Sequence, residues 1–307
     1  MSWTDRQRFI TICCESMIKK FVALAVTLAA ILTPSAAEKK ILLVAGKMSH
    51  GAGDHEFNAG SMLLAKCLNQ TPGIKATVEK GGWPADEKAF DGIDAVFFYM
   101  DGGAGHPVAK PEHIKKVREL AAKGVGISFG HYGVECVPGE PGDAWKELIG
   151  GHYEHEYSVN PMWSPDYQKF PKHPVANGVK PFSVRDEWYF NMRWRNDTNG
   201  IVPILVAKPS DDVRDGPYVY PKGPYDHIVK DSGRDEAMMW AVENKNGQRG
   251  FGFTGGHIHR NWGNENFRKA VLNGLVWIAH GEVPKDGIQS TITDEDLAAN
   301  LDDKPKK

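Results

Sequence analysis

Short runs of consecutive apolar residues alternate with amphipathic segments in the first part of the chain, and this alternation constrains the fold more than any other feature. A run that is apolar at every position fits a strand buried on both faces, as in parallel sheets. Parallel neighbours need a long crossover, which is usually a helix. The runs are 40–45 (KILLVA), 95–100 (AVFFYM) and 125–129 (VGISF), and 74–79 is a further expected strand. The amphipathic segments are 56–69, with Asp54 as its expected N-cap, and 111–122. The pattern predicts an α/β fold with a mostly parallel central sheet flanked by helices.

The rest of the chain departs from this pattern and then returns to it. Residues 138–235 are rich in Pro, Gly, Trp and Tyr, and we interpret them as a loop-rich insertion of loops and short strands, including 201–207. The later expected elements are a hairpin of 237–243 and 249–254, a helix at 264–279 and a short acidic helix at 294–301. We therefore expect one domain at 38–283 and a polar C-terminal tail at 284–307.

The first 37 residues predict export. Residues 17–37 combine Lys19 and Lys20, an apolar run and a small-residue cleavage site at 35–37, which are the three parts of a secretory signal peptide. The apolar run is short for a membrane span, and an uncleaved anchor or a buried helix is the alternative. Residues 1–16 fit an upstream start codon. We expect a periplasmic or secreted mature chain, 38–307, with no membrane contact after signal cleavage.

Charge and cysteine content exclude two classes of protein. The formal net charge is −2, so there is no basic excess to neutralise phosphates, and nucleic acid is not an expected partner. Only Cys67 and Cys136 lie in the predicted mature chain, which excludes a disulfide-rich scaffold. The sequence leaves open whether these two cysteines pair and whether the chain forms homo-oligomers.

Histidines gather where the predicted strands end, which is where open parallel sheets bind their ligands. The strand ends lead to His50 and His55, to Asp101 and His106, to His131, and to His257 and His259. We expect His257 to take part in function and His259 to pack in the core.

The sequence Gly130-His131-Tyr132-Gly133 predicts a tight turn that holds one side chain up into the site. Thiol hydrolases and glutamine amidotransferases place a cysteine nucleophile at such an elbow, whereas this chain has His131. A histidine serves as general base, general acid or metal ligand, and a turn whose histidine only packs is the alternative. Cys136 lies beyond the strand end, so a thiol hydrolase is the less favoured hypothesis.

Two further segments carry polar chemistry. The segment 186–189 (DEWY) places two carboxylates beside two aromatic rings. Carboxylates orient histidines or metals, and aromatic faces stack on sugar rings. His152 and His155 have a spacing that suits a metal, but they lack a third ligand nearby in the sequence. The Gly-rich loop 102–105 lacks the Walker and dinucleotide spacings, so we infer no nucleotide site.

Three segments together resemble the ThuA-like, trehalose-utilisation family. They are GISFGHYGVE at the elbow, HPVANGVKPFSVRDEWYF, and the closing RGFGFTGGHIHRNWGNENFRKAVLNGLVWIAHGEVP, and the likeness spans residues 40–283. The resemblance implies a flavodoxin-like fold of the class I glutamine-amidotransferase type, with histidine where amidotransferases carry cysteine. His131 matches that position, and His173-Pro174, Asp186-Glu187 and Gly256-His257 match other recurrent positions. The resemblance also implies disaccharide use, together with dehydrogenases that form 3-keto sugars.

These observations predict a carbohydrate-active isomerase, lyase or hydrolase without a cysteine nucleophile, acting on a disaccharide or its 3-keto derivative. A 3-keto sugar has an acidic C–H beside its carbonyl, and its removal needs a base, an acid and a group that stabilises the enediolate. The expected catalytic residues are His131, His257, Glu187 and His55, and the expected substrate-binding residues are Asp186, Trp188, Tyr132 and Asp101. The sequence establishes no cofactor, although the histidine count allows a divalent metal. A non-catalytic carbohydrate-binding module, stacking sugars on its tryptophans, is the alternative.

Overall fold

The computed structural model describes residues 37–305, so the predicted signal peptide and residues 1–16 lie outside the described residues. Glu38–Lys307 form one compact unit. The strands are β1 (Lys39–Ala45), β2 (Ile74–Glu79), β3 (Ala95–Tyr99), β4 (Gly126–Gly130), β5 (Gly151–His152), β6 (Met162–Trp163), β7 (Asp186–Glu187), β8 (Arg193–Trp194), β9 (Ile201–Ala207), β10 (Glu236–Glu243) and β11 (Arg249–Phe253). The helices are α2 (Phe57–Leu68), α3 (Pro111–Ala122), α4 (Glu140–Ile149), α5 (Asp211–Arg214), α6 (Asp226–Val229), α7 (Glu265–Ile278) and α8 (Asp294–Ala298). Within 37–305, none of the helices has the length and apolar character that a membrane crossing needs.

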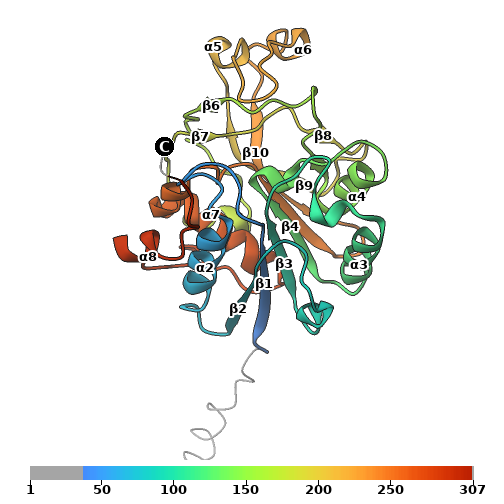
Figure 1. Ribbon diagram of the computed structural model, residues 1–307, viewed down its shortest axis with the longest axis vertical. Helices are drawn as coiled ribbons and strands as arrows, with labels where there is room; N and C mark the ends of the chain where they lie inside the picture. The colour runs from blue at the N-terminus through green and yellow to red at the C-terminus, as the bar shows by residue number, and fades with distance from the viewer. Residues whose placement is uncertain (1–36, 306–307) are drawn as a thin grey trace, which may run out of the picture. The chain divides into compact units, whose positions relative to one another are not determined.

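The central sheet has seven strands in the order β2-β1-β3-β4-β11-β10-β9. The pairs from β2 to β11 are parallel, and β10 runs antiparallel to both β11 and β9, which confirms the mostly parallel sheet and the hairpin. Alternate residues of β1 enter two different cores: Leu43 packs with residues of α2 and α7, and Leu42 with residues of α3 and α4. Figure 1 shows these helix pairs on opposite faces of the sheet. Burial on both faces explains why the inner strands β1 and β3 are almost entirely apolar, whereas the edge strand β2 (IKATVE) is partly exposed and carries polar residues.

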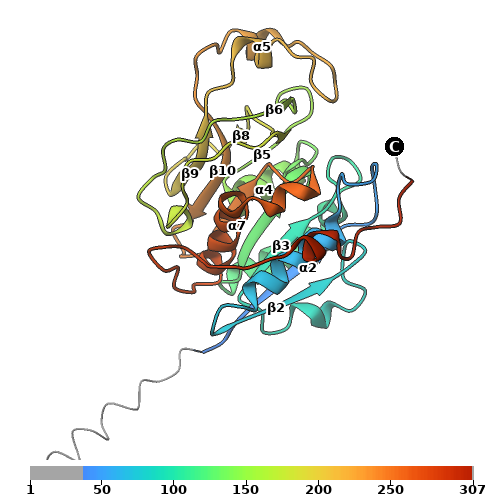
Figure 2. The same cartoon turned by 90° about the vertical axis from the view of Figure 1, so that its left-hand side faces the viewer.

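The insertion contains more regular structure than we expected. Helix α4 occupies a segment that we interpreted as loop. Strand β9 forms the edge of the central sheet beside β10, whereas we expected it to be one of the short strands added outside that sheet. Two small antiparallel pairs, β5–β8 and β6–β7, complete the insertion. In Figures 1 and 2, β6 and β8 lie beyond the carboxyl ends of the parallel strands. The insertion therefore covers the edge of the sheet at which ligands are expected.

Two details near the N-terminus of α2 differ from expectation. The residue before the helix is Glu56, so the prediction that Asp54 caps it is wrong. Asp54 instead forms a bridge with Ile258, and the Glu56 carboxylate accepts the N–H of Gly53 at 2.9 Å. The C-terminal tail also folds back here: Lys304 Nζ lies 3.3 Å from Glu56 Oε1, and both side chains are buried. The tail thus packs within the same unit as the domain.

Candidate functional site

Four neighbouring strands, β1, β3, β4 and β11, end at one edge of the sheet, and the segment after each delivers a polar side chain to a single cluster. These side chains are His50 and His55 after β1, Asp101 after β3, His131 after β4 and His257 after β11, and Glu187 joins them from β7 in the insertion. Of the eight predicted site residues, the structure therefore brings five into the cluster, and Tyr132 lines the pocket beside it.

The backbone at the elbow is strained. His131 has a φ of 50°, in the left-handed region that non-glycine residues rarely adopt. A Cβ on the preceding Gly130 would lie 2.4 Å from the Phe97 ring, so only glycine fits there. His50 and His55 also have positive φ values, of 59° and 49°. Such strain persists only where the surroundings over-determine it, and it concentrates at functional sites.

His55 lies at the centre of the contacts. Its Nδ1 is 2.8 Å from Asp101 Oδ1, and its Nε2 is 2.9 Å from His257 Nδ1 and 3.0 Å from His131 Nε2. On the far side, Glu187 Oε2 lies 2.6 Å from His257 Nδ1 and 3.8 Å from His131 Nε2. The ligand atoms of His55, His131, His257 and Glu187 all lie within 4.8 Å of one another, a grouping that can hold a metal ion.

The three inner histidines differ in charge. Burial, reinforced by the neighbouring histidines, holds the pKa values of His55 and His131 well below the usual range. Burial alone would also lower the pKa of His257, but the hydrogen bond and the charge of Glu187 outweigh it and raise that pKa. In the absence of an ion, a positive charge in the cluster therefore resides on His257, and His55 and His131 are neutral.

A pocket of about 280 Å³ opens beside the cluster. Its lining is rich in titratable groups: His50, His55, Tyr132, Glu135, His155, Asn160, Glu187, Tyr189, Val219 and Tyr220. Burial raises the pKa of Glu135 to about 7, and the charge of Glu187 acts in the same direction. Asn160 donates a hydrogen bond of 2.8 Å to Glu187 Oε1. Our sequence analysis missed Glu135, Asn160 and Tyr220. Of these, only Glu135 had a signal in the sequence, because it ends the elbow segment that was expected to be functional.

Two predicted substrate contacts do not fit the structure. Trp188 is fully buried and packs edge-on against Phe253 and Phe267, so its ring is not available to a sugar. Asp186 is also fully buried, and its carboxylate accepts the N–H groups of Gly256 and Ile258 at 2.8 and 3.1 Å. Asp186 therefore positions the loop that carries His257.

The remaining candidate side chains lie apart from the cluster. His259 is buried, with Nε2 2.9 Å from the Leu297 carbonyl, which is a packing role. Among the described residues, His152 and His155 belong to no group with metal-ligand geometry. Cys67 and Cys136 are free and buried in the cores on opposite faces of the sheet. Burial raises the pKa of both thiols, which argues against a thiolate nucleophile.

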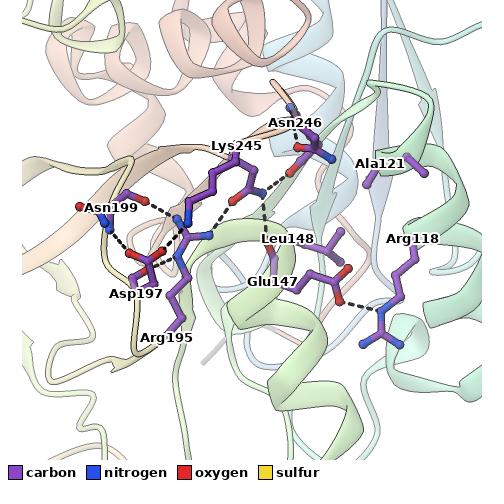
Figure 3. A pocket seen from close by; sticks show the side chains of 12 residues that line it. Arg118, Ala121, Glu147, Leu148, Arg195, Asp197, Asn199, Lys245 and Asn246 are labelled. Atoms are coloured by element: carbon purple, nitrogen blue, oxygen red, sulfur yellow. Dashed lines mark hydrogen bonds and ion pairs between the residues drawn. The ribbon is translucent and has the colours of Figure 1, made fainter.

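Figure 3 shows a larger pocket, of about 410 Å³, between α3, α4 and the turn after β10. Its cations are paired with the protein itself: Arg118 with Glu147, Arg195 with the carbonyls of Asp197 and Asn199, and Lys245 with Asp197. These contacts tie neighbouring loops together. Convergent groups with shifted pKa values are the better mark of a functional site, so we place function at the strand-end cluster.

Comparison with known proteins agrees with the fold. The family model for trehalose utilisation (ThuA) matches residues 40–278. A putative ThuA-like protein from Bacteroides uniformis superposes with a TM-score of 0.56 at 15% identity, over 80% of this chain and 95% of that one. A glutamine amidotransferase from Thermotoga maritima gives a TM-score of 0.43 at 7% identity, over 80% of this chain and 100% of that one. No curated protein matches the sequence.

Proposed function

We propose a function from one premise: the chain belongs to the trehalose-utilisation (ThuA) family. The proposed protein is a secreted or periplasmic enzyme that acts on a disaccharide or its 3-keto derivative by proton transfer in the strand-end pocket. The observation that carries this proposal is the pocket itself, in which Glu135 and Glu187 share the wall with His50 and His55. General acid–base catalysis needs side chains that accept and donate protons, and carboxylates and histidines can do both.

The size and rim of the pocket support a sugar unit as the reacting group. Sites for small molecules usually measure roughly 300–1,000 Å³, so a pocket of about 280 Å³ suits one sugar ring, with the second ring outside. Tyr220 lies at this pocket and is 68% exposed, so its ring is free to stack on a sugar face. Tyr220 takes the role that we expected of Trp188.

The structure changes the expected distribution of roles. His131 is fully buried, its Nδ1 is bonded to the Thr254 carbonyl and its Nε2 faces His55, so we assign it to positioning. Glu135 lines the pocket with a pKa of about 7, which suits a base at neutral pH. Glu187 lines the pocket and its carboxylate raises the pKa of His257 behind it, so in the chain without an ion we assign to His257 the positive charge that stabilises an oxyanion.

The proposed reaction begins with removal of the proton on the carbon beside the ketone. Glu135 accepts this proton, and the electron pair moves onto the ketone oxygen to give an enediolate. The enediolate then either regains a proton at a different position, which is isomerisation, or expels the glycosidic oxygen, which takes up the proton, and this is elimination. Neither route consumes an oxidant or reductant.

A non-catalytic binding module is the weaker candidate, because the tryptophans build the core. Of the tryptophans in the described residues, six are buried and Trp83 and Trp194 are partly buried. The buried ones are Trp145, Trp163, Trp188, Trp240, Trp262 and Trp277.

The test is an NMR time course of the purified chain with a panel of 3-keto disaccharides and their unoxidised parents. We expect turnover of a keto sugar and a loss of at least about 100-fold in kcat for Glu135→Gln, as for other general bases. Glu119→Gln, on the exposed side of α3, is the matched control and should retain full activity. Sugar binding without any product would instead identify a binding module, and the absence of both would refute the proposal.

A further inference from the structure

Four ligand atoms in the cluster are arranged around a common centre. His55 Nε2 lies 2.9 Å from His257 Nδ1 and 3.0 Å from His131 Nε2, and Glu187 Oε2 lies 2.6 and 3.8 Å from the latter two atoms. A zinc-sized ion with ligands at about 2.0–2.2 Å places tetrahedral ligand atoms roughly 3.3 Å apart. The four distances differ from this spacing by about 0.3–0.7 Å, and all four atoms lie within 4.8 Å of one another, so small side-chain movements would let them surround one ion.

In two of the histidines, the hydrogen bond made by Nδ1 determines whether Nε2 carries a hydrogen or a lone pair. His131 Nδ1 lies 2.9 Å from the Thr254 carbonyl, which can only accept, so Nδ1 carries the hydrogen. His55 Nδ1 is fixed in the same way by Asp101 Oδ1 at 2.8 Å. Both rings are buried, so the neutral form is favoured and each Nε2 presents a lone pair. Two lone pairs then face each other at 3.0 Å, an arrangement that a cation between them would stabilise.

The groups behind the four ligands follow the pattern of metal sites. A carboxylate or carbonyl behind each imidazole fixes its tautomer and orientation: Asp101 lies behind His55, Thr254 behind His131, and Asp54 Oδ1 lies 3.6 Å from His257 Nε2. Asn160 donates a hydrogen bond to Glu187 Oε1, so Oε2 remains available to the cluster. The ligands are therefore oriented before any ion arrives.

Without a metal ion, the hydrogen-bonding groups of the cluster are satisfied less completely. His257 can donate from Nδ1 to Glu187, and the Tyr189 hydroxyl, 3.3 Å away, can donate to His131 Nε2. His55 Nε2 then shares the Nδ1 hydrogen of His257 with Glu187 and still faces the lone pair of His131 Nε2 at 3.0 Å. A buried acceptor whose hydrogen bonding is only partly met destabilises the protein, and an ion bound to all four atoms removes that cost.

We propose that His55, His131, His257 and Glu187 bind one divalent transition-metal ion. Three imidazoles and one carboxylate suit zinc and its neighbours better than magnesium or calcium, which prefer all-oxygen sites. The ion lies under the pocket, since His55 and Glu187 both line it. There its charge would replace that of a protonated His257, whose Nδ1 becomes a ligand, in stabilising an oxyanion. Metal binding shares its site with the proposed function but does not depend on any sugar.

The test is metal analysis of the full chain purified without a histidine tag. We expect one transition-metal ion per chain by mass spectrometry, its removal by a chelator, and rebinding of Zn²⁺ or Co²⁺ at one equivalent by calorimetry. Co²⁺ also gives a visible absorption spectrum that reports its ligands. Glu187→Gln and His257→Ala should each lower the affinity for Zn²⁺ by at least about 100-fold, and Asp101→Asn by about 10–100-fold.

His227→Ala is the matched control, because His227 is an exposed histidine outside the cluster and its loss should not change Zn²⁺ binding. Circular dichroism and the unfolding temperature separate loss of ligand from loss of fold. If a variant fails to fold, the Co²⁺ spectrum of the unchanged chain still decides the matter. A chain that holds no ion and binds neither probe at one equivalent would overturn the proposal, whether or not a keto sugar is turned over. Conversely, metal binding without sugar turnover would leave this inference intact and refute the proposed function.

Discussion

Glu135 links catalysis to stability at the scale of a single residue. Its pKa is about 7 in the folded chain and about 4.3 in an unfolded one. The folded state therefore holds the proton more tightly, and stability is lost as the pH rises from about 4 to 7. In chain stripped of metal, we expect Glu135→Gln to raise the free energy of unfolding at pH 8 by on the order of 1–3 kcal/mol, and to have little effect at pH 4.

The measurement is urea unfolding of the two chains across this pH range, with Glu119→Gln as the control. The groups that act on Glu135 are Glu187, which raises its pKa, and His155, whose Nδ1 lies 3.9 Å from Oε1. A stability difference that is constant with pH would show that Glu135 titrates normally.

Residue-level prediction from sequence succeeded where strand ends set the positions. His55, His131 and His257 follow apolar runs, so the sequence alone places them at one edge of the sheet. Asn160 lies in an insertion without periodicity, and its position depends on tertiary packing alone. The prediction for Trp188 was wrong. Its aromatic ring suggested stacking on a sugar, but the ring is large and apolar, and its burial stabilises the core.

At the scale of elements, the C-terminal tail fixes the loop that carries His55. Lys304 Nζ donates to the carbonyls of Asp54 and His55, at 2.6 and 3.2 Å, and pairs with Glu56. Lys304→Ala would leave the Glu56 carboxylate buried and unpaired, and we expect it to destabilise the chain by about 3–5 kcal/mol. Thermal unfolding followed by circular dichroism checks this value.

The double variant Glu56→Gln with Lys304→Met should recover much of this loss, because it buries no unpaired charge. Lys285→Ala, at an exposed position of the same tail, is the control and should change stability by less than about 0.5 kcal/mol. Equal losses in the single and double variants would mean that the ion pair is not what holds the tail.

Elements with long periodic patterns were predictable, and short ones were not. Helix α7 was expected at 264–279 and spans Glu265–Ile278, with Asn264 as its N-cap. Helix α4 was missed although Pro141 stands in its first turn and Gly150 ends it in the left-handed conformation. Its surroundings, rich in Pro and Gly, resembled a loop. The polar tail gave little apolar signal, because only separate residues of it, such as Ile288, enter the core, and the Lys304 ion pair and hydrogen bonds hold its end.

At the scale of the whole molecule, the boundary of the compact unit coincides with the predicted cleavage site. The unit begins at Glu38 and its first strand at Lys39, directly after the small residues at 35–37. We expect the full chain, expressed in a bacterium with an export pathway, to appear in the periplasm or medium with Glu38 as its first residue. Intact-mass and N-terminal analysis measure this, and a chain that keeps Met1 or stays with the membrane fraction would contradict it.

The parallel part of the sheet was predictable because a single rule, strands joined by crossover segments, governs β1 to β4. The edge strand β9 escaped this rule, because it is only partly apolar and its partner β10 lies farther along the sequence.

The burial of both cysteines also decides how the molecule can be handled in the laboratory. With Cys67 and Cys136 at 0% and 1% exposure, the described surface offers no thiol to a reagent. In the chain 38–307, a single cysteine introduced at an exposed position, such as Lys115, would therefore accept a fluorophore or spin label alone. The surroundings of that label could then be followed in solution without removing a native cysteine.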